Sequence, residues 1–210
     1  MKKLILVGGG GHCKSVLDAA LAMHEFDKIV ITDPDIPVGT EIMGCKVVGS
    51  DEQLPELKKQ GYDYAFVTVG SIKSTAVRRK IAENLKTIGF QFPVIIDPSA
   101  IVSSTVTVGD GTFIGKRAVL NAETQVGSHC IINTGAILEH ESIVGDFTHV
   151  SIGAILCGNC HVENDCFVGA GSTLIQGGHV GNHTIIGAGA LVNKELPSNC
   201  TAVGIPVRIG

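Results

Sequence analysis

The sequence has no tryptophan, and aromatic residues make up only 4% of its 210 residues, whereas glycine occurs 27 times. A core of this composition must be built from stacked aliphatic side chains rather than large rings, as in solenoid proteins. No stretch approaches the roughly 18 apolar residues of a membrane span. The formal net charge of −4 also provides no basic face for nucleic acid. We therefore expect neither a membrane span nor a nucleic-acid partner.

Cysteines number seven, and their spacing does not resemble that of a metal site. Cys157 and Cys160 form a lone CxxC, and Cys166 follows without a fourth partner. We therefore expect neither disulfides nor zinc. The apolar run after Lys3 is only four residues long, from Leu4 to Val7, which is too short for a secretory signal. Cytoplasmic localisation is the resulting expectation.

Residues 1–92 alternate between strand and helix patterns. The expected strands are Lys3–Val7, Lys28–Thr32, Cys45–Val48 and Tyr64–Val69, and the expected helices are Lys14–Met23, Asp51–Gln60 and Ser74–Leu85. This alternation predicts a Rossmann-like α/β domain with a parallel sheet.

The glycine run Gly8–Gly11 connects the first strand to the first helix, where free N–H groups and the positive helix end favour phosphate. Asp33 ends the second strand, where a carboxylate could accept hydrogen bonds from ribose hydroxyls. Cys13 replaces the third glycine of the dinucleotide fingerprint. The pattern therefore favours a nucleotide-linked ligand over a nicotinamide cofactor, with a tight turn that binds nothing as the alternative. His12, at the tip of the turn, is either a solvated loop residue or a ligand contact.

Residues 93–210 contain a six-residue repeat that we expect to run without interruption from Ile96 to Pro197. Seventeen positions in steps of six, from Ile96 to Val192, are all aliphatic, and the residue four places after each is mostly small. This regularity is typical of a hexapeptide β-helix. Cys130, Cys160 and Cys166 fall in the small, inward slot, so we expect them to be buried packing residues.

Because three hexapeptides complete a coil, every eighteenth residue should stack on one of three faces. One face, here called the wet face, has a polar residue in its third position in every coil: Asp110, Ser128, Asp146, Asn164 and Asn182. A second face carries a column of glycines, Gly135, Gly153, Gly171 and Gly189, with Ala170 and Ala188 before the last two. This column could accept a ligand against bare backbone.

The third face places His140 between Ala122 one coil below and Gly158 one coil above. These small neighbours leave space around the imidazole, and Glu139 and Glu141 flank it in the sequence. We therefore predict that His140 is a general base, with Glu141 or Glu139 holding its other ring nitrogen. The backbone N–H of Gly158 is the candidate donor to an oxyanion.

The whole chain resembles the hexapeptide-repeat sugar acyltransferases of the sialic acid O-acetyltransferase family, which includes N-acetyltransferases that act on UDP-4-amino sugars in bacillosamine synthesis. The resemblance rests on the glycine turn Val7–His12, Asp33, the strand end Val67–Gly70, Asn133–Thr134, Glu139–Glu141, His149–Ala154 and the closing Gly204–Pro206.

The resemblance implies a left-handed β-helix, a homotrimer, acetyl-CoA bound between subunits without a metal, and a role in cell-surface polysaccharide biosynthesis. It further implies that His140 is the base and that Glu141 raises its basicity. The residues implied near acetyl-CoA are His149, Gly153, Ala170 and Ala188, although His149 could equally be a solvated turn residue. Those implied for the nucleotide sugar are Gly10, Gly11, His12, Asp33, Gly70 and Asn133. Pro34 departs from the family pattern of a second acid, for which Asp35 could compensate.

Three other functions remain open at this stage. One is O-acetylation of sialic acid or another sugar hydroxyl. Another is a metalloenzyme of the hexapeptide carbonic anhydrase type, which needs three converging histidines, although none of the available ones forms a familiar ligand pair: His140, His149, His161, His179 and His183. The last is a non-catalytic scaffold that binds a nucleotide.

Overall fold

The computed structural model describes all 210 residues and divides into two compact units, which are described separately below. The first unit comprises residues 1–71 and 76–98, and the second comprises residues 72–75 and 99–210. The expected boundary at residue 92 thus falls before the end of the first unit. None of the helices combines the length and the apolar character that a membrane span requires.

The first unit contains a five-stranded sheet in the order β3-β4-β2-β1-β5. Its strands are β1 (Lys3–Val7), β2 (Lys28–Thr32), β3 (Glu41–Ile42), β4 (Cys45–Gly49) and β5 (Tyr64–Val67). The four longer strands are parallel, as expected, but β3 pairs antiparallel with β4 at the edge. The expected parallel sheet is therefore confirmed for these four strands, and β3 adds an antiparallel edge strand that was not expected. Met43 and Gly44 both have positive φ, 49° and 81°, which is the geometry of a two-residue hairpin turn.

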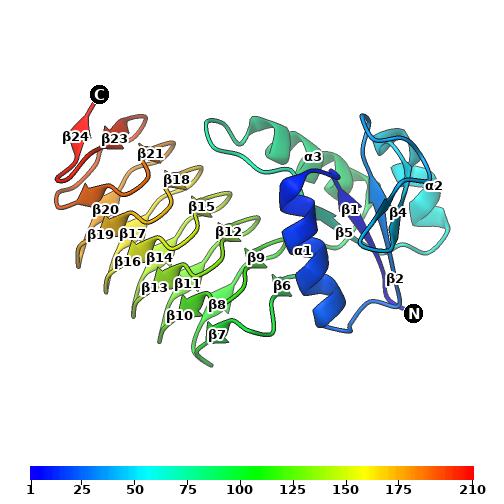
Figure 1. Cartoon of the computed structure of the whole chain (residues 1–210), viewed down its shortest axis with the longest axis horizontal. Helices are drawn as coiled ribbons and strands as arrows, with labels where there is room; N and C mark the ends of the chain where they lie inside the picture. Colours follow the sequence, from blue (N-terminus) through cyan, green and yellow to red (C-terminus); the bar gives the residue numbers. More distant parts are fainter. The chain divides into compact units, whose positions relative to one another are not determined.

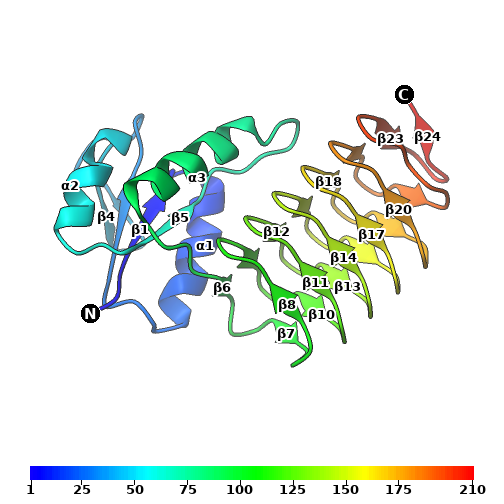
Figure 2. The ribbon, with the colours of Figure 1, turned by 180° about the vertical axis from the view of Figure 1, so that it is seen from behind.

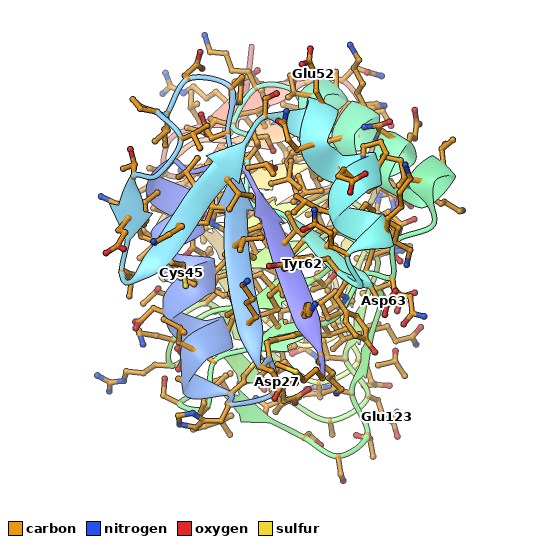
Figure 3. The ribbon with its side chains drawn as sticks, turned by 90° about the vertical axis from the view of Figure 1, so that its right-hand side faces the viewer. Asp27, Cys45, Glu52, Tyr62, Asp63 and Glu123 are labelled. Atoms are coloured by element: carbon orange, nitrogen blue, oxygen red, sulfur yellow. The ribbon has the colours of Figure 1, made fainter.

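Helices cover both faces of this sheet, with α1 on one side and α2 on the other (Figures 1 and 2). The helices are α1 (Gly11–Ala22), the short 3₁₀ helix η1 (Asp51–Gln53), α2 (Leu54–Lys59) and α3 (Ala76–Ile88). α1 begins at Gly11 rather than Lys14, so the end of the glycine run supplies its N-cap, Gly10, and its first residue. Cys45 and Tyr62 lie on the sheet face beside α2 and line a pocket of about 520 Å³ (Figure 3).

The second unit is a parallel β-helix whose coils stack from green to red in Figure 1. One sheet comprises β7 (Ile101–Val102), β10 (Val119–Leu120), β13 (Ile137–Leu138), β16 (Ile155–Leu156), β19 (Thr173–Leu174) and β22 (Leu191–Val192). The wet-face sheet comprises β8 (Thr107–Val108), β11 (Gln125–Val126), β14 (Ile143–Val144), β17 (His161–Val162) and β20 (His179–Val180). The third comprises β9 (Phe113–Ile114), β12 (Ile131–Ile132), β15 (His149–Val150), β18 (Phe167–Val168) and β21 (Ile185–Ile186), extended by β23 (Thr201–Val203) and β24 (Arg208–Ile209).

The interior of the β-helix is filled by the second residue of each strand and by the small slot residue of each turn. Cys130, Cys160 and Cys166 are buried in this slot, as predicted, and each thiol lies within hydrogen-bonding distance of a backbone carbonyl of the next coil. Burial is the main cause that raises the pKa of the Cys166 thiol to about 11. The slot cysteines are therefore packing residues rather than reactive groups.

The wet face is held by a ladder of side chains. The N–H of Ser128 donates to Oδ1 of Asp146 at 2.7 Å, and the N–H of Asp146 donates to Oδ1 of Asn164 at 2.7 Å. The N–H of Asn164 in turn donates to Oδ1 of Asn182 at 3.2 Å. The polar third position predicted from the sequence is thus confirmed as a means of satisfying turn N–H groups.

The repeat is not uninterrupted, because two residues are missing from its period after Val192. Leu196 rather than residue 198 bridges to Val180, and β23 then pairs with β21. The expectation of an unbroken repeat to Pro197 was therefore wrong in its last coil. The shortened connection keeps the ladder but places Glu195, which precedes Leu196, above His179.

We predict that Thr148→Val lowers the free energy of unfolding by roughly 1–3 kcal/mol. Thr148 is fully buried; its hydroxyl donates to the carbonyl of Glu163 at 2.7 Å and accepts from the N–H of Cys166 at 3.0 Å. Valine has the same shape but leaves both partners unsatisfied. Denaturant unfolding followed by circular dichroism measures the change. The control Thr173→Val, at an outward strand position, should stay within about 0.5 kcal/mol, and equal stability of the two variants would contradict the prediction.

Candidate active site

His140 and Glu141 form a pair on the turn that follows β13. The distance from Nδ1 of His140 to Oε2 of Glu141 is 3.0 Å, and the two side chains are 51% and 58% exposed. Glu141 has a φ of 60°, the left-handed conformation that turns the chain toward the next strand. Glu139 makes no side-chain contact of this kind. The structure therefore distinguishes the two glutamates that the sequence left open, and it places Glu141 on the ring.

The imidazole of His140 lies against the backbone of Gly158 in the next coil. A Cβ atom added to Gly158 would be 2.5 Å from both Cε1 and Nε2 of the ring. Any residue larger than glycine at position 158 would therefore clash with the imidazole of His140 in this position. The expectation of open space above the ring was wrong on this side, because the ring fills that space.

The N–H group of Gly158 has no acceptor within the β-helix, whereas the equivalent groups of the wet face are bonded to side chains of the next coil. Glycine supplies no side chain that could shield this group. Gly158 is itself buried beside the imidazole, so its N–H is an unpaired donor there, and its role as oxyanion donor stays a prediction.

His149 and Asn133, two further predicted site residues, lie together on a second face. Nδ2 of Asn133 is 3.2 Å from Nε2 of His149, while Oδ1 of Asn133 accepts from the N–H of Thr134 at 2.8 Å. With the amide oxygen occupied in this way, the amide nitrogen of Asn133 is the group that faces Nε2 of His149. The ring of Phe167 packs edge-on against His149, with centroids 5.1 Å apart.

The glycine column forms a bare corner of the β-helix. Gly135, Gly153, Gly171 and Gly189 have φ values of 63–66°, and a Cβ added to any of them would meet nothing within 4 Å. Phe147 and Asp165 adopt nearly the same φ, 59°, at another corner. The backbone alone therefore does not require glycine here. Ala170 and Ala188 are exposed beside this column, but one coil earlier the same position is Ile152, which is 56% exposed. The surface therefore lacks large side chains in the coils of Gly171 and Gly189.

In the first unit, Asp33 fastens the glycine turn. Its Oδ2 accepts from the N–H of Gly9 at 2.6 Å, and its Oδ1 accepts from the N–H of Asp35 at 2.9 Å. Each oxygen keeps a second lone pair that could still accept from a ligand. Gly10 and Gly11 are exposed at the start of α1, with nothing within 4 Å of an added Cβ. Their N–H groups belong to the first helical turn, where anions bind.

His12 and Gly70 lie next to each other, since a Cβ added to Gly70 would be 3.8 Å from Cβ of His12. The first unit also has a pocket of about 550 Å³, whose lining includes residues next to the glycine turn and to Gly70. It is lined by Val7, Gly8, Asp33, Pro34, Asp35, Asp51, Val69, Val77, Lys80, Ile81 and Asn84. Burial, and then the charge of Asp33, raise the pKa of the Asp51 carboxyl.

Sequence reasoning missed three polar residues of this pocket, Asp51, Lys80 and Asn84. The sequence did contain a signal for Lys80 and Asn84: they are four residues apart in a predicted helix, so their side chains lie on the same face of α3. Asp51 follows β4, at the strand ends where ligands of such sheets bind.

Of the five histidines considered for a metalloenzyme, the structure brings together only His161 and His179, and it adds Glu163 rather than a third histidine. The sequence spacing, in which none of the five histidines forms a familiar ligand pair, did not predict this grouping, which lies on the wet face and not beside His140.

Comparison with known proteins places these features in a family. Residues 3–85 match the model of the PglD N-terminal domain. A UDP-N-acetylbacillosamine N-acetyltransferase from Bacillus subtilis is 34% identical over 116 residues, which span 54% of this chain and about half, 51%, of the relative.

Two solved structures match over the full length. PerB from Caulobacter crescentus, in complex with CoA and GDP-perosamine, is 33% identical with a TM-score of 0.90, covering 100% of this chain and 98% of PerB. The acetyltransferase domain of PglB from Neisseria gonorrhoeae, in complex with acetyl coenzyme A, is 33% identical with a TM-score of 0.92, covering 100% of this chain and 99% of that domain. This chain therefore belongs to the family of hexapeptide-repeat sugar acetyltransferases of the bacillosamine type.

Proposed function

We propose that the protein transfers an acetyl group from acetyl-CoA to the amine of a nucleotide-linked amino sugar, with His140 as the general base. The observation that carries this proposal is the pair of His140 and Glu141, whose contact at 3.0 Å uses Nδ1 and leaves Nε2 for a substrate. PerB was solved with CoA and GDP-perosamine, and the PglB domain with acetyl coenzyme A, which supports both substrates of the proposed reaction.

In the proposed reaction, the acceptor amine attacks the thioester carbon of acetyl-CoA as Nε2 of His140 removes a proton from the nitrogen. The negative charge that forms on the thioester oxygen is stabilised by the N–H of Gly158. Collapse of this intermediate forms the amide and breaks the carbon–sulfur bond. The CoA thiolate leaves and takes the proton from His140, so that the enzyme returns to its starting state without an acyl-enzyme.

The bare strip along Gly135, Gly153, Gly171 and Gly189 is the surface proposed for acetyl-CoA, with Ala170 and Ala188 beside it and His149 with Asn133 on the same face. The family resemblance further suggests a homotrimer in which this strip faces a neighbouring subunit. A long, thin cofactor needs a surface without projecting side chains, and the coils of Gly171 and Gly189 provide it, while the exposed Ile152 borders the strip one coil earlier.

The nucleotide sugar is proposed to bind the first unit, at the open N–H groups of Gly10 and Gly11 and in the pocket that Asp33 lines. His12 and Gly70 flank the same turn. Asp35 also lines this pocket, so it supplies a second carboxylate despite Pro34. The related proteins include one named for a UDP sugar and one bound to a GDP sugar, and both nucleotides are therefore candidates.

The proposed function is tested by incubating the full chain with acetyl-CoA and one acceptor at a time. UDP-linked and GDP-linked 4-amino sugars test N-acetylation, and free sialic acid tests the alternative of O-acetylation. We expect CoA release and a mass gain of one acetyl group with a nucleotide-linked amino sugar. Transfer only to a hydroxyl would replace the amine in the proposal, and absence of transfer to every acceptor would favour the scaffold alternative.

His140→Ala should lower turnover by roughly 100- to 10,000-fold, because the amine would lose its proton acceptor in the transition state. Binding of acetyl-CoA, measured by calorimetry, should change little. His24→Ala is a matched control, since His24 is an exposed histidine beyond the end of α1. A His140→Ala enzyme that retains more than about a tenth of wild-type turnover would remove His140 from this role.

Glu141→Gln and Glu139→Gln provide a matched pair. Glu141 contacts Nδ1 of His140 and Glu139 does not, so only Glu141→Gln should lower kcat, by roughly tenfold or more, with KM for both substrates nearly unchanged. Steady-state kinetics of the two variants measure the difference. Equal losses in the two variants would show that the contact does not orient the base.

A further inference from the structure

The wet face carries a second cluster of titratable side chains, separate from the His140 turn. His161 and His179 are the first residues of β17 and β20 and lie directly opposite each other in the ladder. Their side chains point outward, because Val162 and Val180 occupy the interior. Glu163 follows on the turn after β17. Glu195 continues the column of His161 and His179, because the repeat is two residues short at this coil and Leu196 pairs with Val180.

The two imidazoles converge on one carboxylate oxygen. Oε1 of Glu163 is 3.6 Å from Nε2 of His161 and 3.4 Å from Nε2 of His179. The rings are nearly perpendicular, at 85°, with centroids 5.3 Å apart. One ligand atom from each of the three residues lies within 4.8 Å of the others. The imidazoles of two successive coils thus each direct their Nε2 atom toward Oε1 of Glu163.

We propose that His161, Glu163 and His179 form a binding site for a zinc ion. In a tetrahedral zinc site with bonds of about 2.0–2.1 Å, neighbouring ligand atoms are about 3.3–3.4 Å apart. Both histidine–glutamate distances already approach this value, so only the two nitrogen atoms need to move closer. Two imidazoles and one carboxylate are a ligand set that suits zinc better than magnesium or calcium, which prefer oxygen ligands alone.

Glu195 supports the proposal from the other side of the ring. Its Oε1 is 3.4 Å from Nδ1 of His179, while Nε2 of the same ring points to Glu163. No hydrogen bond joins the two groups, and Nδ1 of His179 is buried without a hydrogen-bond partner. A small rotation of the exposed Glu195 side chain would make its carboxylate the orienting partner that a metal-bound histidine usually has. A simple ion pair explains the arrangement less well. The histidines are 43% and 38% exposed, so solvent screens their attraction to Glu163, and such pairs contribute little.

The site would join two successive coils and the shortened final turn, and it leaves a fourth position for water. It is therefore proposed as a structural cross-link and not as part of acetyl transfer. This role is independent of the proposed function, because none of its residues is placed in the catalytic turn. It departs from the sequence-based expectation that the protein has no metal site.

The test is metal binding by the full chain after removal of metal with a chelator. Zinc is added in equilibrium dialysis, bound metal is measured by mass spectrometry, and cobalt replaces zinc for an absorbance readout of tetrahedral coordination. We expect one zinc per chain and a rise in the thermal unfolding midpoint when zinc is present. Absence of saturable zinc binding by the wild-type chain would overturn the proposal.

Variants locate the ion. Glu163→Gln and His179→Asn should each lower zinc affinity by at least about tenfold, and Glu195→Gln should lower it by roughly 10- to 100-fold if it orients His179. His183→Asn is the matched control, because His183 is another outward histidine near a carboxylate, 3.9 Å from Asp165, and should bind zinc as the wild type does. Wild-type affinity in Glu163→Gln and His179→Asn would show that any bound zinc lies elsewhere. Glu163→Gln keeps the size of the side chain, so it tests the proposal even if His179→Asn does not fold.

Discussion

The 18-residue coil is the constraint on which the β-helix and its candidate sites depend. Up to the shortened last coil, each strand hydrogen-bonds to the strand 18 residues away, so every outward side chain there has neighbours that are fixed by the sequence at that spacing. His140 lies against Gly158 for this reason, and His161 lies opposite His179 for the same reason. The chemistry of the surface is therefore set by columns of residues, and one large side chain in the wrong column would displace its neighbour.

The sequence predicted most of this unit because its period is strict. The buried slot, the polar ladder of the wet face and the closeness of His140 to Gly158 all follow from counting in steps of 18. The choice between Glu139 and Glu141 did not follow, because both flank the histidine in the sequence. It depends on the left-handed φ of Glu141, which brings its carboxylate to Nδ1. The free space above His140 was misjudged. Counting in steps of 18 shows that Gly158 has no side chain, but it does not show that the ring of His140 itself occupies the space this leaves.

The first unit was predicted less completely because its pocket combines residues from separate segments. Strand ends and the glycine turn could be recognised locally, which led to Asp33, but Lys80 and Asn84 reach the pocket from α3. The edge hairpin was missed because Met43 takes a positive φ without the asparagine or aspartate that normally signals such a turn. Asp33 was predicted as a ligand contact, yet the structure shows it also holding Gly9 in place. Asp33 therefore shapes the glycine turn independently of any ligand.

The corners of the β-helix show how one backbone geometry can hold different surfaces. All three corners use a left-handed residue, and Glu141, Phe147 and Gly153 have φ values of 60°, 59° and 63°. L-residues accept this conformation at the other two corners, and Arg117 accepts it, with a φ of 54°, in the glycine column itself, so the coil geometry alone does not require the run of glycines. The shortened turn after Val192 likewise changes the surface while the interior stays the same. The ladder continues through Leu196, so folding is preserved, while the outward position beside His179 passes to Glu195. Changes that leave the interior unaltered are thus the ones through which this fold acquires new surface chemistry.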